Sequence, residues 1–521
     1  MPSNRRIYWA FFILLAVSAL ARGFIAGFIE LGNDEVYYLT YARFPALSHF
    51  DHPPMIGLVI QLFTLNFTFD HEFFLRLASV VLGTVSTLMM FLIGREIKNP
   101  LTGLYAALLF TTSFYGFILS GTFILPDAPQ VCFWLVALYF LLKSLPDHDL
   151  TSDSRTYLLL AAVFAGFALI SKYHSVFLPA GVFVYCLRYN RRWFAAKEFY
   201  GFFLIIALVA LPVLFWNIEN NFISFTYHES RVTITQSGFK PQYFLTEMVG
   251  EFFYNNPVNV VLIITALFAL ALRRNFLGES PRRLLLWTSI PLIVVFQSFS
   301  LFRSTLPHWT GPGYLGLIFI ASAFLSEPAW ETKRLRLVPW QLIVALSLIF
   351  TVSVTVMGQI RYGWIHLQHM KVNDPSLDMV GWQQLGEKFA PLAKYDEEHG
   401  LMGRNSPIVT FRWFPAANFD YYVGRKIHKP VYAIGSLERI HKYHWINRIR
   451  GNLKAGSDAW YIALSDDYED PVSLYGNLFS RVAPADTIYI TRGRDTVRRA
   501  FVFHLTGLKQ EMAFPAGVDE K

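Results

Sequence analysis

Residues 199–216 read FYGFFLIIALVALPVLFW, an apolar run that contains no charged side chain. A helix needs about 20 mostly apolar residues to cross the hydrocarbon core of a membrane, and this run is close to that length. Similar runs occur at approximately 7–29, 74–94, 101–120, 128–143, 156–171, 174–188, 256–272, 284–302, 309–326 and 338–358. Together they predict a polytopic α-helical membrane protein with about eleven spans.

The composition of the chain agrees with this class. Of its 521 residues, 54% are hydrophobic and only 16% are charged, whereas soluble globular proteins carry roughly 25% charged residues. These values exclude a water-soluble enzyme, a disordered chain and a fibrous protein. The apolar runs stop near residue 358, so we predict a transmembrane domain over 1–358 and a polar domain over 359–521.

The basic residues predict the orientation. The net charge is +8, and Lys and Arg cluster in short segments between apolar runs. With a cytoplasmic N-terminus, every expected inner connection carries at least two basic residues, as the positive-inside rule requires. We therefore expect a multi-pass protein of the inner (plasma) membrane with an extracytoplasmic C-terminal domain and no nucleic-acid partner. A cleavable signal peptide that begins at Arg5 and Arg6 is the alternative for the first run.

The C-terminal domain shows alternating strand and helix signals. We predict strands at 407–411 and 459–464, a helix at 415–423 and a hairpin over 487–506 that turns near Gly493. This pattern is typical of a small α/β unit. The residues from 508 on are expected to form a loose tail.

Two long loops, about 30–73 and 217–255, are expected on the outer face. The first is rich in aromatic residues and poor in Gly and Ser. Apolar and aromatic residues interrupted by single acids indicate short helices that lie in the membrane interface.

Ionisable side chains gather on the same predicted face. Each has a simpler explanation: the acids can be helix N-caps, the lysine can extend to the interface, and the histidines can be surface residues. Their convergence at one membrane depth favours function, because charges so close to lipid are costly and usually functional. The set comprises Asp34, Asp51, His52, Asp127, Lys172, His228 and His308.

This set suits one kind of chemistry. A carboxylate can take a proton from a hydroxyl while cationic and imidazole groups hold a phosphate, as glycosyl or phosphoryl transfer requires. The chain has no Gly-rich nucleotide loop of the Walker or Rossmann type. Nucleotide sugars are normally absent outside the cytoplasm, so the expected donor is a sugar on a polyprenyl phosphate.

Two short motifs carry a family resemblance. The run DEVYY at 34–38 and the run FDHPPM at 50–55 resemble the first outer loop of GT-C lipid-donor glycosyltransferases. The chain is most similar to the branches that resemble protein mannosyltransferases and lipid A aminoarabinose transferases. Weaker matches are LPD at 125–127, SKY at 171–173, WN at 216–217, PHW at 307–309 and FPAA at 414–417.

The resemblance implies roles for individual residues. Asp34 corresponds to the proposed catalytic base and Asp127 to a second essential acid that holds the site or the acceptor. His52 stands where the aminoarabinose branch has a phosphate-binding lysine, and Lys172 is expected to share that task. The remaining residues expected in the substrate pocket are Glu35, Tyr37, Tyr38 and His308.

The resemblance also bears on metal and acceptor. It implies no required cofactor, and a divalent cation on Asp51, His228 and the donor phosphate is an open alternative, although two protein ligands make a loose site. The mechanism it implies is one inverting displacement. The acceptor stays open between a lipid such as lipid A, a glycan and a protein. The C-terminal domain either docks that acceptor or forms a structural lid.

Two other functions compete with this interpretation. A lipid-linked-sugar flippase or transporter usually places ionisable residues near the bilayer midplane and often contains internal repeats. The acids here are expected at the outer face, and no repeat is visible. A non-catalytic membrane scaffold with an outer binding domain is the second alternative.

Overall fold

The computed structural model describes residues 3–146, 150–233, 238–327, 337–366 and 374–514. The chain forms two compact units. The helical unit comprises Met1–Ala26 and Ala46–Val352, and the sheet unit comprises Gly27–Pro45 and Ser353–Lys521. The first outer loop is therefore divided: its first part groups with the C-terminal residues, and its second part groups with the helices.

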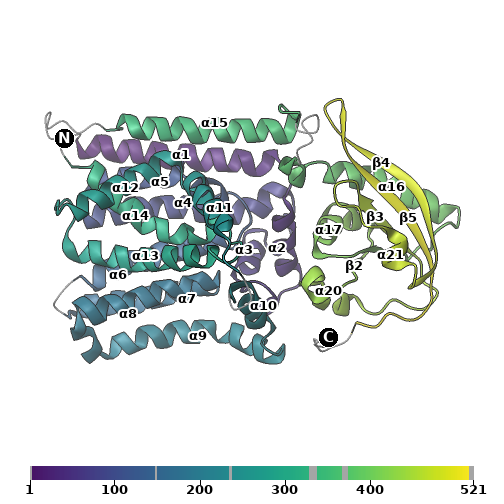
Figure 1. The fold of residues 1–521 in the computed structure, drawn as a ribbon, viewed down its shortest axis with the longest axis horizontal. Helices are drawn as coiled ribbons and strands as arrows, with labels where there is room; N and C mark the ends of the chain where they lie inside the picture. The colour runs from purple at the N-terminus through teal and green to yellow at the C-terminus, as the bar shows by residue number, and fades with distance from the viewer. Residues whose placement is uncertain (1–2, 147–149, 234–237, 328–336, 367–373, 515–521) are drawn as a thin grey trace. The chain divides into compact units, whose positions relative to one another are not determined.

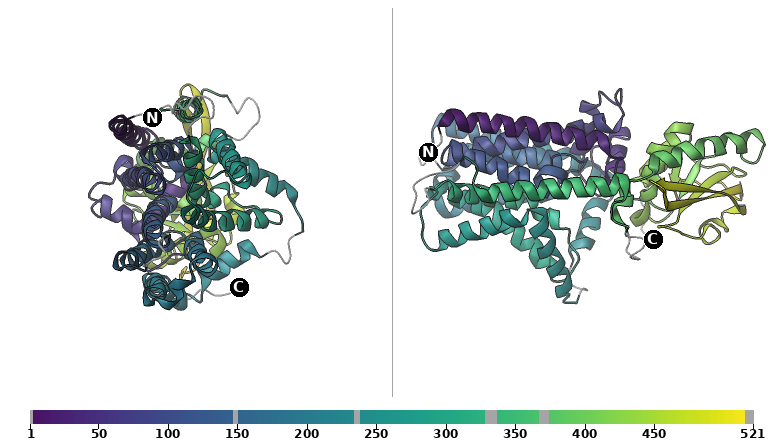
Figure 2. Two further views of the ribbon diagram at one scale, coloured as in Figure 1. Left: turned by 90° about the vertical axis from the view of Figure 1, so that its left-hand side faces the viewer. Right: turned by 90° about the horizontal axis from the view of Figure 1, so that it is seen from above.

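The helical unit consists of helices and short helical turns, most of them roughly aligned, as Figure 1 and the left view of Figure 2 show. Its elements are α1 (Asn4–Phe28), α3 (Met55–Phe63), α4 (Glu72–Ile97), α5 (Pro100–Thr112), η1 (Tyr115–Leu119), α6 (Asp127–Ser144), α7 (Ser152–Leu169), η2 (Tyr173–Val176), α8 (Phe177–Tyr189), η3 (Arg191–Ala195), α9 (Lys197–Glu219), α10 (Ile223–Val232), α11 (Pro241–Tyr254), α12 (Pro257–Ala271), α13 (Glu279–Ser300), η4 (Pro307–Thr310), α14 (Gly311–Leu325) and α15 (Trp340–Tyr362).

Length and composition identify the membrane helices. In the described part of the chain, α1, α4, α9, α13 and α15 are each long and apolar enough to cross a membrane. The pair α11 and α12 makes a sixth if it is counted as one span, although it bends by 100°. Many side chains on α1, α9 and α15 are exposed and apolar, as lipid-facing helices require. The protein is therefore a multi-pass membrane protein.

The shorter predicted spans are also helical, with one interruption. The expected run 101–120 divides into α5 and the π-helical turn η1. The α-helical bonding stops where the Ser113 N–H donates to the Phe110 carbonyl and the Gly116 N–H donates to the Ser113 hydroxyl. This break places Tyr115 at the start of a new turn.

The sheet unit contains one helix from the first outer loop and the whole C-terminal part. Its elements are α2 (Asn33–Arg43), η6 (Pro375–Met379), α16 (Trp382–Glu398), β1 (Ile408–Thr410), α17 (Trp413–Asn418), η7 (Phe419–Gly424), α18 (Arg425–Ile427), β2 (Val431–Ala433), α19 (Leu437–Ile440), α20 (Tyr443–Arg450), β3 (Ala459–Leu464), α21 (Pro471–Tyr475), β4 (Phe479–Arg492) and β5 (Asp495–Leu508).

The five strands form one mixed sheet in the order β2-β1-β3-β5-β4. β1 pairs in parallel with β2 and with β3, while β3 and β4 pair antiparallel with β5. Every residue of β3 is buried, which fits the central strand of the order. The predicted strands at 407–411 and 459–464 and the hairpin that turns near Gly493 are confirmed.

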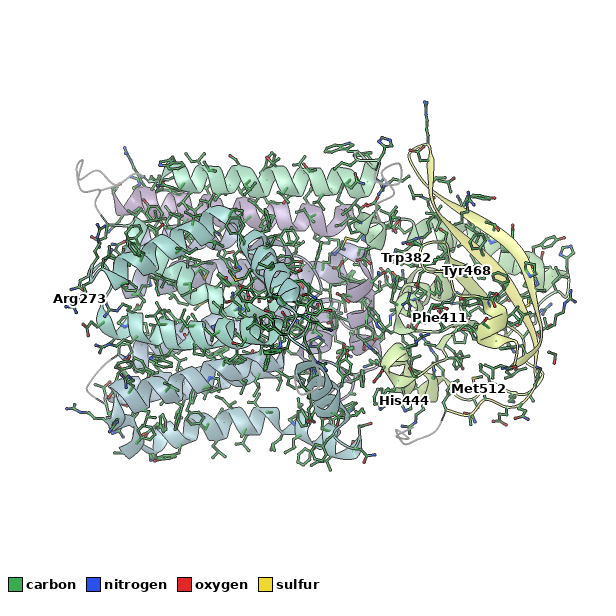
Figure 3. The ribbon with its side chains drawn as sticks, in the orientation of Figure 1. Arg273, Trp382, Phe411, His444, Tyr468 and Met512 are labelled. Atoms are coloured by element: carbon green, nitrogen blue, oxygen red, sulfur yellow. The ribbon has the colours of Figure 1, made fainter. Side chains whose placement is uncertain are left out.

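Packing in the sheet unit corrects one expectation. Leu453 and Met512 exchange backbone hydrogen bonds of 3.1 and 2.9 Å, and the ring of Phe514 stacks on Tyr432 at 5.5 Å. Residues 508–514 are therefore packed against the domain, and the prediction of a loose tail was wrong for them. The fully buried Trp382 and the buried Phe411 belong to the core of the same unit (Figure 3).

Candidate functional site

A buried ion pair lies at the centre of the candidate site in the helical unit. Asp127 is the first residue of α6, and Lys172 lies in the turn between α7 and η2. Their Oδ2 and Nζ atoms are 2.8 Å apart, and the side chains are only 2% and 4% exposed. The hydroxyl of Tyr115 donates to the other Asp127 oxygen at 3.1 Å. The carboxylate thus has a partner for each oxygen.

Local packing fixes both members of this pair. Gln130, one turn after Asp127, donates to the Ser175 hydroxyl at 3.0 Å, so the start of α6 is tied to η2. The ring of Tyr115 lies against Gly311, where a Cβ atom would come within 2.2 Å of it. Only glycine permits this approach between η1 and the start of α14.

Several imidazoles surround the ion pair. His308 and His52 both interact electrostatically with Asp127 and Lys172. The ring of His52 lies 6.4 Å from that of His228, and the ring of His174 lies 5.4 Å from that of Trp309. The structure therefore brings His52 and His308 together with the ion pair, and His228 lies beside His52.

Asp51 and His228 meet, but not as a recognisable metal site. A ring nitrogen of His228 lies 2.9 Å from the backbone carbonyl oxygen of Asp51. Nearby, the Ser224 hydroxyl donates to the His49 carbonyl at 2.9 Å, so α10 is fastened to this part of the first outer loop. Within the described residues, no group of three or more His, Cys, Asp or Glu side chains is arranged to hold a metal ion. The two-ligand site expected on Asp51 and His228 stays a prediction, and we derive no step through it.

The second group of predicted residues lies on α2 in the sheet unit. Asp34 is exposed, whereas Glu35 is buried with 2% of its surface accessible. A Glu35 carboxylate oxygen accepts a hydrogen bond of 3.0 Å from the Gly32 N–H and so closes the first turn of the helix. Asp34 is thus the carboxylate of this turn that faces outward, and Glu35 has a structural role.

The tyrosines of α2 are packed into the sheet unit. Tyr37 is 2% exposed and its ring lies 4.8 Å from that of Trp413. Its hydroxyl accepts a hydrogen bond from the Lys442 backbone N–H at 3.4 Å. Tyr38 is 7% exposed and lies 5.5 Å from the ring of Tyr41. Both tyrosines contribute to the packing of α2, which sequence alone did not indicate.

The two groups of predicted residues belong to different compact units. Asp51, His52, Asp127, Lys172, His228 and His308 lie in the helical unit, and Asp34, Glu35, Tyr37 and Tyr38 lie in the sheet unit. Sequence reasoning missed three further polar side chains: Tyr115, His174 and Asp378. Tyr115 lies inside an apolar run, His174 directly follows the quoted SKY motif, and Asp378 is an isolated acid without a motif.

Comparisons with known proteins agree with this arrangement. Residues 51–216 match the family model described as dolichyl-phosphate-mannose-protein mannosyltransferase. The structure is similar to that of ArnT from Cupriavidus metallidurans bound to undecaprenyl phosphate, with a TM-score of 0.60 and 15% identity over 94% of this chain and 97% of that one. The likeness to ArnT shows a shared fold, and the family model matches residues 51–216 of the 521 in this chain.

A curated relative is similar to part of this chain. It is 22% identical over 307 residues to the lipid A galacturonosyltransferase RgtD of Rhizobium johnstonii, covering 58% of this chain and 62% of that protein. This chain thus spans about three fifths of the length of the curated relatives it matches. The family-model match begins at Asp51 and includes Asp127 and Lys172 but not Asp34.

Proposed function

We propose that this chain is an integral-membrane glycosyltransferase of the GT-C type that moves a sugar from a polyprenyl phosphate to an extracytoplasmic acceptor. The observation that carries the proposal is the buried pair of Asp127 and Lys172, 2.8 Å apart and surrounded by imidazoles. Buried charges that are held this closely are expensive and typical of a functional site near a membrane. The similar structure of ArnT is bound to undecaprenyl phosphate, the kind of lipid carrier that a lipid-borne donor would leave behind.

The proposed reaction is one inverting displacement. Asp34 takes the proton of the acceptor hydroxyl, and the acceptor oxygen forms a bond to the anomeric carbon of the sugar. The bond from that carbon to the phosphate oxygen breaks, and its electron pair stays on the polyprenyl phosphate. Phosphate is a good leaving group, so the step needs no acid to protonate it.

The other residues support this step. Asp127 orients Lys172 and Tyr115, so the ammonium group is held in place beside His52 and His308. Imidazole N–H groups and the ammonium stabilise the negative charge that develops on the leaving phosphate. The proposal includes about eleven spans, an inner-membrane location, a cytoplasmic N-terminus and an acceptor that is a lipid, a glycan or a protein.

A comparison of cells with and without the gene tests the function. Mass spectrometry of envelope glycolipids and glycoproteins should show a mass difference equal to one sugar, and the carrier of that mass identifies the acceptor. Asp34→Asn should restore the protein but not the modification. Asp153→Asn is a matched control, because Asp153 is also an exposed acid in the first turn of a helix, α7.

The outcomes separate the candidate functions. If Asp34→Asn restores the modification fully, the role of base is wrong. If the protein is instead a lipid-linked-sugar flippase, cells without the gene should accumulate the donor on the inner leaflet. Asp34→Asn should then change the transport activity little.

A further inference from the structure

The peptide that leads into α2 is held by polar groups of the C-terminal residues. The Leu31 N–H donates to the Tyr422 hydroxyl at 2.7 Å, and the Asn33 N–H donates to a carboxylate oxygen of Asp378 at 3.2 Å. The side-chain amide of Asn418 donates to the Asn33 side-chain oxygen at 2.7 Å. The first N–H groups of a helix have no partner within the helix, so such bonds fix its start.

Close packing accompanies these bonds. A Cβ atom on Gly32 would come within 2.9 Å of the Met379 methyl group and 3.0 Å of the second Asp378 oxygen. A side chain at position 32 would have to displace the Met379 methyl group or the Asp378 carboxylate. Asp378 therefore lies directly against the turn that carries Asp34.

Asp378 is itself held rigidly. Arg498 of β5 donates to the carbonyls of Leu377 and Val380 at 3.0 and 3.4 Å, on either side of Asp378. The indole N–H of Trp382 donates to the Asp378 carbonyl at 2.9 Å. The backbone around this carboxylate is thus fixed to β5 and α16.

The other end of α2 is fastened in the same way. The Lys442 ammonium donates to the Phe44 carbonyl at 2.6 Å and lies 4.7 Å from the centre of the Tyr41 ring. Cations at the last carbonyls of a helix are favourable, because these carbonyls carry partial negative charge. The sheet unit therefore holds α2 at both ends.

The charges that interact with Asp378 come from two elements, α2 and β5. Asp34 and Glu35 on α2 are negative, Arg498 on β5 is positive, and Arg498 is already paired with Asp466 at 2.7 Å. Burial raises the pKa of Asp378 to about 7; among the smaller effects the Asn33 N–H lowers this pKa, Asp34 and Glu35 raise it, and Arg498 lowers it. Asp374, at the start of η6, is paired with Arg492 at 2.6 Å and contributes little free charge.

We infer that Asp378 is a positioning residue for Asp34. Asp378 fixes the first turn of α2 and sets the charge beside the Asp34 carboxylate. The inference rests on the proposed role of Asp34 as the base. The inference gives the C-terminal sheet unit a part in catalysis, because this unit fixes the position of Asp34 and the charge beside it.

The charge effect has a definite sign. Like charges disfavour each other's ionised form, and the effect is reciprocal. When Asp378 loses its proton near pH 7, Asp34 holds a proton more strongly and becomes a better base. The rate of transfer by the wild-type protein should therefore rise between pH 6 and pH 8.

Two substitutions separate charge from position. Asp378→Asn keeps an oxygen that accepts from the Asn33 N–H but removes the charge, so it should lose the rise in rate and be several-fold slower at pH 8. Asp378→Ala removes both, so it should also lose the rise in rate and be about tenfold slower than Asp378→Asn at every pH, the effect of one lost hydrogen bond. Asp495→Asn, an exposed acid at the tip of the hairpin, is the matched control and should behave like the wild type.

The assay uses the full-length purified protein. Membranes from cells without the gene supply donor and acceptor, and the product is counted by mass spectrometry at each pH. Asp378→Glu keeps the charge and should keep the rise in rate. Asn418→Ala removes the hydrogen bond to the Asn33 side chain. It should lower the transfer rate, but the rate should still rise between pH 6 and pH 8. These two variants test the inference independently if Asp378→Asn melts well below the wild type.

The result that overturns the inference differs from the one that overturns the function. If Asp34→Asn is active, the proposed base is wrong whatever Asp378 does. If Asp34→Asn is inactive while Asp378→Asn matches the wild type in rate and in pH profile, the base stands and the positioning role of Asp378 is rejected.

Discussion

The Nζ atom of Lys172 lies 2.8 Å from Oδ2 of Asp127, and both side chains are almost completely buried. An acid in this position is committed to its cation and is poorly placed to accept a substrate proton. Asp34, by contrast, is exposed at the first turn of α2. This difference supports separate roles for the two acids, with Asp127 as the support of the site and Asp34 as the base.

Asp127→Asn should abolish transfer and lower the stability of the protein by about 3 kcal/mol, because it leaves the Lys172 charge buried without its counterion. The double variant Asp127→Asn with Lys172→Met should recover most of the stability without recovering transfer. Thermal unfolding in detergent and the transfer assay measure the two effects. Wild-type transfer by the double variant would show that the pair has no part in the reaction.

Tyr115→Phe should lower the transfer rate by up to about tenfold, because the lost hydrogen bond joins a neutral donor to a charged acceptor. The Asp127 carboxylate would keep Lys172 but lose the group that fixes its other oxygen. Tyr105→Phe, at another buried tyrosine of the same unit, serves as the control. Equal transfer rates in Tyr115→Phe and Tyr105→Phe would show that the Tyr115 hydroxyl has no part in the site.

Gly311→Ala should destabilise the protein by about 1–3 kcal/mol, because the new methyl group would overlap the Tyr115 ring. Transfer should fall as well, since the displaced ring would pull its hydroxyl from Asp127. Gly278→Ala has ordinary contacts and should change melting little. Identical melting temperatures for both variants would contradict the packing described for Gly311.

The stability of the protein should depend on pH through Asp378. Its pKa is about 7 in the folded protein, against 3.8 for an ordinary aspartate, mainly because it is buried. A raised pKa in the folded state stabilises the protein fully below about pH 4, and this contribution is lost as the pH rises through 7. Asp378→Asn should therefore flatten the decrease in melting temperature between pH 5 and pH 8. If the melting temperature decreases equally in the wild type and in Asp378→Asn, groups other than Asp378 cause the decrease.

Much of the fold could be predicted because its signals are local. Apolar runs of membrane length marked the helices, and alternation around Gly493 marked the β4–β5 hairpin. The break after Thr112 was not predicted, because the apolar run continues through it and only the Ser113 hydrogen bonds to Phe110 and Gly116 mark it. The packing of residues 508–514 depends likewise on Leu453 and Tyr432, which lie far away in the sequence.

The candidate site was predictable only in part. Asp127 and Lys172 were found because single charges beside apolar runs are conspicuous. Their direct pairing was not predicted, since Lys172 was expected to bind phosphate. The sequence also gave no sign that Glu35 and Tyr37 are structural residues, because their roles depend on Gly32 and on the C-terminal Trp413. Asp378 has no motif at all.

The grouping of residues 27–45 with residues 353–521 limits how this protein can be recombined with its relatives. A chimera that exchanges only the C-terminal part would match a foreign sheet to a native α2, and the hydrogen bonds from Leu31 and Asn33 would meet unfamiliar partners. Substrate specificity should therefore be transplanted with both segments together, although more than 300 residues separate them along the chain.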